Sequence, residues 1–151
     1  MDMTGQERIA APRDVVWAAL NNPEILKRCI PGCQNLDWTS PTELAATVKV
    51  KLGPVSASFS GEVTLSNIKA PASYTISAEG KGGIAGFARG GADVVLSEDG
   101  GETLLSYAAH AHVTGKIAQL GARLVNSSAK KLAQQFFADF SAAVSGEAAA
   151  R

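Results

Sequence analysis

Apolar and polar side chains alternate along most of the middle of the chain. Residues 44–52 and 55–65 each place an apolar side chain at every second position, and Gly53-Pro54 separates the two runs. This period of two is typical of a strand with one buried face. With Gly53-Pro54 as the turn, Val48 faces Phe59, and both apolar sets share one face of a hairpin.

The same alternation predicts three more strands. One covers residues 74–80, and two flank Asp99-Gly100, a dipeptide that favours a two-residue hairpin turn. Centring the hairpin on this dipeptide leaves the buried face of both strands uncharged. It pairs Leu96 with Thr103, Val94 with Leu105, Ala92 with Tyr107, Gly90 with Ala109 and Ala88 with Ala111.

Two short helices are predicted before these strands. Residues 4–9 form a short strand, and Pro12 then opens a helix over residues 13–20 with one apolar stripe. A second helix follows over residues 22–28, and Pro31-Gly32 must end it because proline cannot continue a helix.

The carboxy-terminal part has the period of a helix. Apolar residues recur at a spacing near 3.6 from about residue 116 to 144, which predicts one long amphipathic helix that ends near Gly146. We expect a single domain over residues 1–146 and a frayed tail over residues 147–151.

These elements predict an α+β fold. About six strands form an antiparallel meander, and the long helix lies across the buried face of this curved sheet. Glycines gather in the central strands, where they mark either bulges that curve the sheet or room for a bound molecule. They are Gly80, Gly82, Gly83, Gly86, Gly90 and Gly91.

The composition of the 151 residues narrows the class of protein. The chain is 46% hydrophobic and has 14 basic and 14 acidic residues, which argues against a nucleic-acid footprint or a polybasic membrane patch. No apolar run approaches membrane-spanning length, and residues 1–12 lack the apolar core of a secretory signal. We therefore expect a cytoplasmic protein whose two cysteines stay reduced.

Three segments resemble a known family. WAALNNPEILKRCIPGCQNL at 17–36, GKIAQLGARLV at 115–125 and QQFFADF at 134–140 resemble the CoxG family, which is named after carbon monoxide dehydrogenase, and the resemblance covers essentially the whole chain. That family is a branch of the START-like and Bet v 1-like superfamily. The resemblance implies the helix-grip fold, in which a curved antiparallel sheet wraps around a long carboxy-terminal helix.

The resemblance also implies a role. Proteins of this kind are similar to accessory factors of molybdenum hydroxylases of the carbon monoxide dehydrogenase and xanthine dehydrogenase type, and are not catalytic subunits. Implied roles are recruitment of the enzyme to a membrane, delivery of a lipophilic electron acceptor such as a quinone, and help in maturation. The implied location is the cytoplasm, with peripheral contact at the inner face of the membrane.

The two cysteines lie in the segment CIPGC. Cys29 and Cys33 could form a redox pair, contribute to a metal site or line a structural turn. A zinc site needs about four ligands, and a thioredoxin-like centre needs Cys-x-x-Cys at the start of a helix. We favour a turn with small buried thiols.

His110-x-His112 is the other pattern typical of a metal site. In the predicted register both side chains point to the outer face, with Arg89 across from His110 and no paired carboxylate. Because a zinc site needs three or four converging ligands, we interpret them as solvated histidines.

Acid–base catalysis would need a titratable group on the inward face of the sheet. The carboxylates Glu62, Glu79, Asp93, Glu98 and Glu102 all fall on the outward face. Inward polar candidates are Tyr74, Thr103, Tyr107 and Trp38, which can orient a polar ligand head but are poor bases at neutral pH. No catalytic or nucleotide-binding motif is present, so no catalytic residue, cofactor or metal is predicted.

The inward apolar side chains either fill the core or line a ligand cavity. Small residues such as Ala92 and Ala109 favour space, whereas Phe136, Phe137 and Phe140 are expected to pack the closed end. The candidate ligand-binding residues are Trp38, Val48, Val50, Phe59, Val63, Tyr74, Ile76, Val94, Leu105, Tyr107, Leu120 and Leu124.

Three hypotheses about function follow. The leading one is a carrier or adaptor that holds a lipophilic, quinone-like molecule for a molybdenum hydroxylase. The second is an adaptor with a filled core that docks through Ile25, Leu26, Ile30 and the serine-rich strand face. The third is a cyclase- or hydrolase-type enzyme of the same superfamily.

Overall fold

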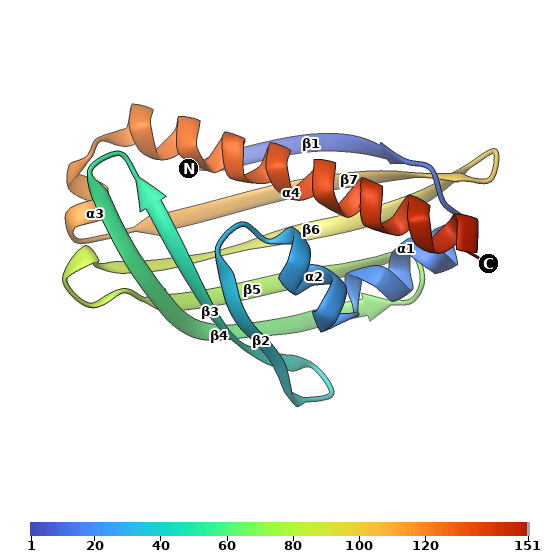
Figure 1. Ribbon diagram of the computed structural model, residues 1–151, viewed down its shortest axis with the longest axis horizontal. Helices are drawn as coiled ribbons and strands as arrows, with labels where there is room; N and C mark the ends of the chain where they lie inside the picture. Colours follow the sequence, from blue (N-terminus) through green and yellow to red (C-terminus); the bar gives the residue numbers. More distant parts are fainter. Residues whose placement is uncertain (151) are drawn as a thin grey trace.

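A seven-stranded antiparallel sheet forms the body of the protein. The computed structural model describes residues 1–146 with their side chains and the backbone of residues 147–150, so the predicted tail over 147–151 lies outside the fully described residues. The strand order is β1-β7-β6-β5-β4-β3-β2 (Figure 1). The strands are β1 (Asp2–Ile9), β2 (Cys33–Ser40), β3 (Glu43–Leu52), β4 (Val55–Lys69), β5 (Ser73–Lys81), β6 (Phe87–Asp99) and β7 (Glu102–Val113).

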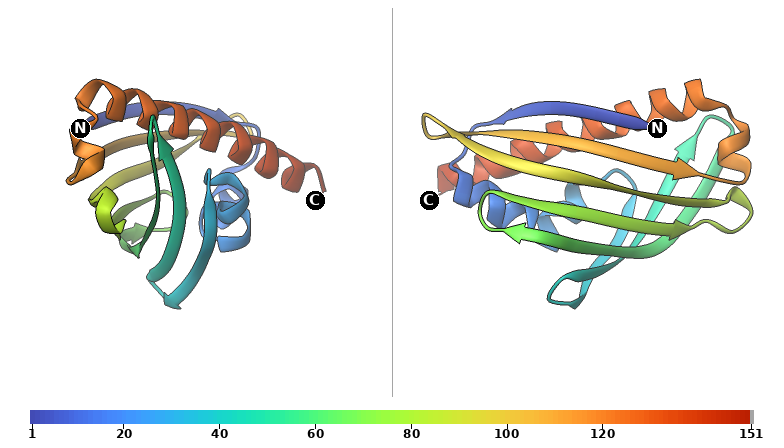
Figure 2. Two further views of the ribbon diagram at one scale, coloured as in Figure 1. Left: turned by 60° about the vertical axis from the view of Figure 1, so that its left-hand side comes forward. Right: turned by 180° about the vertical axis from the view of Figure 1, so that it is seen from behind.

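The helices lie mainly on one side of this sheet. Figure 2 shows the sheet curling beneath the last helix, and the two short amino-terminal helices lie near one end of it. They are α1 (Arg13–Leu20), α2 (Pro23–Cys29), the 3-10 turn η1 (Gly83–Ala85), α3 (Lys116–Gln119) and α4 (Ala122–Ala150). The predicted α+β order, with one strand before the helices and a meander of six after them, is confirmed.

The predicted single helix over residues 116–144 is wrong in one respect. Gly121 has a φ of +92° and separates α3 from α4, because a left-handed residue cannot continue a right-handed helix. The backbone of α4 also continues to Ala150, beyond the predicted end near Gly146.

The first hairpin has the predicted register and the second does not. In β3–β4, Val48 pairs with Phe59 and Leu52 with Val55. In β6–β7 the turn is Gly100-Gly101, both with positive φ, and Asp99 pairs with Glu102. The observed register differs from the predicted one by two residues. A shift of two keeps every side chain on its predicted face.

Two separate apolar clusters stabilise the fold. The main core lies between the sheet and helices α1, α2 and α4, where Phe140 and Val144 of α4 are fully buried. The second cluster lies at the other end and is formed by Leu52, Ala85 and Ile117. Between them the sheet and α4 enclose the cavity described below.

Candidate functional site

An apolar cavity of about 440 Å³ lies under α4. Its walls come from the inner faces of the strands, from α2 and the loop after it, and from the middle of α4. The lining residues are Met3, Leu20, Asn21, Pro23, Leu26, Ile30, Pro31, Leu36, Trp38, Leu44, Val63, Leu65, Tyr74, Ile76, Ala92, Val94, Leu105, Tyr107, Ala109, Leu132, Ala133, Phe136 and Phe137.

Seven of the twelve candidate ligand-binding residues lie in this wall: Trp38, Val63, Tyr74, Ile76, Val94, Leu105 and Tyr107. That they bind a ligand stays a prediction. The other five do not line the cavity. Val50, Phe59 and Leu120 pack against the second apolar cluster, and Val48 lies in β3 between its partners Phe59 and Cys33.

Leu124 is displaced by the break at Gly121. Its side chain lies close to Gly53 in the β3–β4 turn, 3.0 Å from where a Cβ would be on that glycine. The sequence pattern placed Leu120 and Leu124 over the sheet because it treated α3 and α4 as one helix. Leu132, one of the residues on the predicted stripe, lines the cavity instead.

Several lining residues were assigned other roles from the sequence. Phe136 and Phe137 face the cavity, and only Phe140 packs fully in the closed core. Leu26 and Ile30, expected as exposed docking residues, also line the cavity, while Ile25 is buried. A helical period around residues 25–30 shows which side is apolar but not what that side covers.

The cavity reaches the surface beside two exposed apolar side chains. Trp38 on β2 is 39% exposed and Leu132 on α4 is 37% exposed, although both belong to the lining. Such exposure of large apolar groups is unusual inside a packed core. We call the region between these two residues the mouth.

Tyr74 provides the most deeply buried polar group of the wall. Its side chain is part of the buried core, with the residue 5% exposed, and its hydroxyl has no hydrogen-bond partner among the described residues. Burial raises the pKa of Tyr74 far above its ordinary value, so the hydroxyl is protonated at neutral pH. It can therefore donate one hydrogen bond into the cavity.

Asn21 and Tyr107 add two further polar groups. The Asn21 amide nitrogen donates to the Trp17 carbonyl at 2.9 Å, which leaves its side-chain oxygen free to accept. The Tyr107 ring stacks on Phe137, and its hydroxyl lies over Gly5 of β1, where any side chain would collide with it. Burial and the nearby Glu7 carboxylate raise the pKa of Tyr107.

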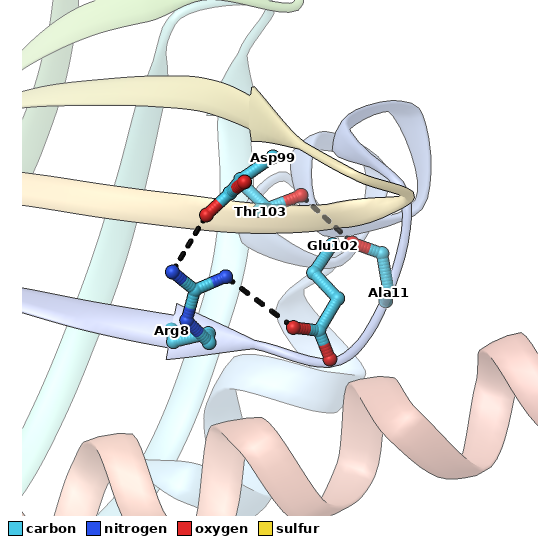
Figure 3. A network of polar contacts seen from close by, with 5 residues as sticks. All are labelled: Arg8, Ala11, Asp99, Glu102 and Thr103. Atoms are coloured by element: carbon cyan, nitrogen blue, oxygen red, sulfur yellow. Dashed lines mark hydrogen bonds and ion pairs between the residues drawn. The ribbon is translucent and has the colours of Figure 1, made fainter.

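Thr103, the fourth inward polar candidate, is not available to a ligand. It is fully buried, and its hydroxyl donates to the Ala11 carbonyl at 2.8 Å (Figure 3). This bond ties β7 to the segment before α1. Beside it Arg8 of β1 contacts Asp99 and Glu102 on both sides of the β6–β7 turn (Figure 3).

The outer face of the sheet carries the charged groups, as predicted. A groove of about 540 Å³ is lined by Glu62, Glu79, Arg89, His110 and His112, among others. The predicted pairing of Arg89 with His110 is wrong: Arg89 pairs with His112, and His110 pairs with Gly91 and with Asp2 of β1. No three His, Cys, Asp or Glu side chains among the described residues could hold a metal ion together.

The CIPGC segment forms the turn between α2 and β2. Cys29 is buried in the core and Cys33 is half-buried at the start of β2, and both are free thiols. Burial raises the pKa of both, and the Asp139 carboxylate adds to the effect at Cys29. Thiolates are the reactive form of cysteine, so neither thiol is activated.

Comparison with solved structures shows the same fold in several proteins. A conserved protein from Geobacillus kaustophilus is 26% identical, with 97% of this chain and 96% of that chain covered and a TM-score of 0.90. Ara h 8.0201 is 16% identical over 95% of this chain and 97% of its own, with a TM-score of 0.69. The Zhui aromatase/cyclase from Streptomyces sp. R1128 is 11% identical over 95% and 93%, with a TM-score of 0.65.

These likenesses establish the helix-grip fold of Bet v 1-like proteins; at such low identity Ara h 8.0201 and the cyclase show the fold alone. Curated protein sequences contain no match to this chain. Within the described residues, no helix has the length and apolar character needed to cross a membrane. The family model for CoxG of carbon monoxide dehydrogenase matches residues 5–145. The chain therefore belongs to the CoxG family, which takes its name from carbon monoxide dehydrogenase.

Proposed function

We propose that this protein is a non-enzymatic accessory factor that carries a lipophilic, quinone-like molecule to or from a molybdenum hydroxylase of the carbon monoxide dehydrogenase or xanthine dehydrogenase type. The observation that carries the proposal is the apolar cavity under α4, whose wall holds the unpartnered hydroxyl of Tyr74. A volume of about 440 Å³ falls in the range of small-molecule sites.

The wall chemistry favours a neutral ligand. No Asp, Glu, Lys, Arg or His belongs to the lining of the cavity, so a charged ligand would lose its hydration without gaining a partner. The Tyr74 hydroxyl can donate to a ligand carbonyl, and the Asn21 side-chain oxygen can accept from a ligand hydroxyl. An aromatic or isoprenoid body with one carbonyl or hydroxyl at its head matches this arrangement.

The same wall argues against catalysis in the cavity. General acid–base chemistry needs a group whose pKa lies near the working pH. The pKa values of the lining tyrosines Tyr74 and Tyr107 are raised, which moves both further from neutrality. The fold is shared with an aromatase/cyclase, but that likeness concerns the fold and not these residues.

Delivery of an electron acceptor is the role that the cavity supports best among recruitment, delivery and maturation. In such a role the hydroxylase passes two electrons to the bound quinone, which takes up two protons and leaves as the quinol. Carbon monoxide dehydrogenase gives its name to this family. One of the subunits of such a hydroxylase is thus the expected protein partner.

The second candidate, a docking adaptor with a filled core, is less well supported. Two of its three proposed docking residues, Leu26 and Ile30, line the cavity, and Ile25 is buried. Little apolar surface then remains on α2 for a partner.

Mass spectrometry of an organic extract, with native mass spectrometry of protein purified from its own host, tests the proposal. We expect one lipophilic molecule per chain, or stoichiometric uptake of an added naphthoquinone. A clean mass of the protein alone together with no uptake of added quinones would contradict the carrier role.

A further inference from the structure

The balanced net charge of the chain hides a strong separation of charge. Residues 49–61, 80–92 and 103–138 contain eight of the 14 basic residues and no Asp or Glu. All 14 acidic residues lie in the rest of the chain, with the other six basic ones. The composition alone therefore gave a misleading argument against a basic surface.

The fold brings parts of these three segments together. The β3–β4 turn, η1, α3 and the start of α4 gather at the end of the molecule opposite α1 (Figures 1 and 2). They meet in the second apolar cluster, formed by Leu52, Ala85 and Ile117. Each of these buried residues follows an exposed one: Lys51, Ile84 and Lys116 respectively.

We call the surface formed by Lys51, Lys81, Ile84, Lys116 and Arg123 the basic end. Lys81 closes β5 just before η1, and Arg123 lies in the first turn of α4, beside Leu124, which reaches the β3–β4 turn. All five side chains are exposed. Lys130 and Lys131 extend positive charge along α4 towards Leu132 at the mouth.

The charges of the basic end are not neutralised by the protein. None of its four cationic side chains makes an ion pair with any described residue. At the opposite end, by contrast, Arg8 contacts Asp99 at 2.6 Å, and Arg13 lies 3.8 Å from Glu98. Positive charge is therefore left unpaired at one end only of these two.

Ile84 is the most exposed large apolar residue of the basic end. It is 81% exposed on the 3-10 turn η1, which the glycines Gly82, Gly83 and Gly86 flank or begin. A protruding aliphatic side chain surrounded by lysine and arginine is the pattern of proteins that bind at the surface of an anionic bilayer. Nucleic-acid sites instead add aromatic or planar groups that stack on bases, and the basic end has none.

We propose that the basic end docks on an anionic phospholipid surface, with Ile84 inserted among the lipids and Lys51, Lys81, Lys116 and Arg123 contacting the head groups. This inference stands apart from the proposed carrier role, because it needs neither an occupied cavity nor a hydroxylase. It also leaves the mouth, between Trp38 and Leu132, next to the basic stretch of α4.

Co-sedimentation with vesicles tests the proposal. We expect the protein to bind phosphatidylcholine vesicles that contain phosphatidylglycerol and not pure phosphatidylcholine vesicles, and to dissociate as salt is raised. Neutralising Lys81→Gln or Lys116→Gln should each lower the affinity about fivefold. Ile84→Ser should lower it further without changing the salt dependence.

Ile68 and Lys69 offer matched controls. Both are exposed at the far end of β4, Ile68 at 45%, so Ile68→Ser and Lys69→Gln should leave vesicle binding unchanged. An equal loss with these variants would mean that binding is non-specific and would overturn the proposal. Failure to bind anionic vesicles at low salt would also overturn it. So would vesicle-independent binding of the purified hydroxylase that only the basic-end variants lose.

Discussion

Trp17 of α1 and Tyr74 of β5 meet edge to face, with ring centroids 5.1 Å apart and ring planes at 71°. This contact joins the first helix to a central strand and fixes the direction of the Tyr74 side chain. The Trp17 carbonyl also accepts the amide of Asn21. The two polar groups best placed for a cavity ligand are therefore both positioned by Trp17.

The first prediction concerns the Tyr74 hydroxyl. Tyr74→Phe removes a hydroxyl that has no hydrogen-bond partner among the described residues, so the free energy of unfolding should stay the same or rise slightly. Affinity for a naphthoquinone should fall by about 1 kcal/mol, or about fivefold, because one hydrogen bond to a carbonyl is lost. Fluorescence titration measures the affinity, and thermal unfolding measures the stability.

Tyr107→Phe is the matched control for that variant. The Tyr107 hydroxyl lies over Gly5 at the edge of the sheet, while its ring stacks on Phe137. The ring and its stacking are retained in the variant, so quinone affinity should not change. Equal losses in the two variants would contradict the role assigned to Tyr74.

The sequence predicts faces better than it predicts positions along the chain. The β6–β7 register differs by two residues because Asp99-Gly100 and Gly100-Gly101 are both acceptable turns, yet each side chain stays on its predicted face. Leu120 and Leu124 were misplaced because one glycine, Gly121, divides the helix. A hydrophobic period continues through such a break without any sign of it.

Contacts between distant segments were out of reach for the same reasoning. The hydrogen bond from Thr103 to Ala11 depends on how the segment before α1 lies against β7. The basic end forms because turns far apart in sequence meet around Ile117. Counting charges along the chain cannot show either relationship, since both are properties of the folded arrangement.

The second prediction concerns alkaline pH. Burial raises the pKa of Tyr74 above its ordinary value of 10.0, so the folded protein holds the phenolic proton at pH values where the unfolded chain releases it. The unfolded state then binds fewer protons, and stability falls as the pH rises above about 10. The slope from this one group is about 1.4 kcal/mol per pH unit.

Denaturant unfolding at increasing pH measures this effect. The cysteines and Tyr107 shift in the same direction, so the wild type is compared with Tyr74→Phe, in which the slope should be smaller. Identical slopes for the two proteins would show that Tyr74 ionises freely in the folded state.

The third prediction concerns the reactivity of the two thiols. Burial raises the pKa of both cysteines, but Cys29 is only 2% exposed whereas Cys33 is partly accessible. Timed alkylation at neutral pH, followed by peptide mass spectrometry, should modify Cys33 first and Cys29 at the rate of unfolding. Rapid modification of Cys29, or a disulfide between the two in the native protein, would contradict a structural role for the turn.

The fourth prediction concerns the glycine of the CIPGC turn. Gly32 has a φ of +77°, and a Cβ there would collide with the Lys49 carbonyl of β3, whose amide donates to the Gly32 carbonyl at 2.8 Å. Gly32→Ala should therefore destabilise the protein by about 3 kcal/mol or more. Gly101→Ala has a similar positive φ but open space around it, and should cost about 1–2 kcal/mol. Equal costs would mean that β3 moves aside freely.

The last prediction distinguishes an open cavity from a filled core. Ala92 and Ala109 are cross-strand partners whose side chains both line the cavity, so leucine at either position would project into it. In a carrier, Ala92→Leu and Ala109→Leu should abolish ligand uptake and leave the free energy of unfolding almost unchanged, since the added methyl groups enter empty space. In a filled core each change should destabilise by about 1–3 kcal/mol through overpacking.

Ala108→Leu is the internal control for this pair, because Ala108 neighbours Ala109 in β7 but is exposed on the opposite face. It should affect neither uptake nor stability. Chemical denaturation and quinone titration of the three variants separate the outcomes. Loss of uptake without loss of stability at Ala92 and Ala109 alone would mean that the space under α4 is where the ligand binds.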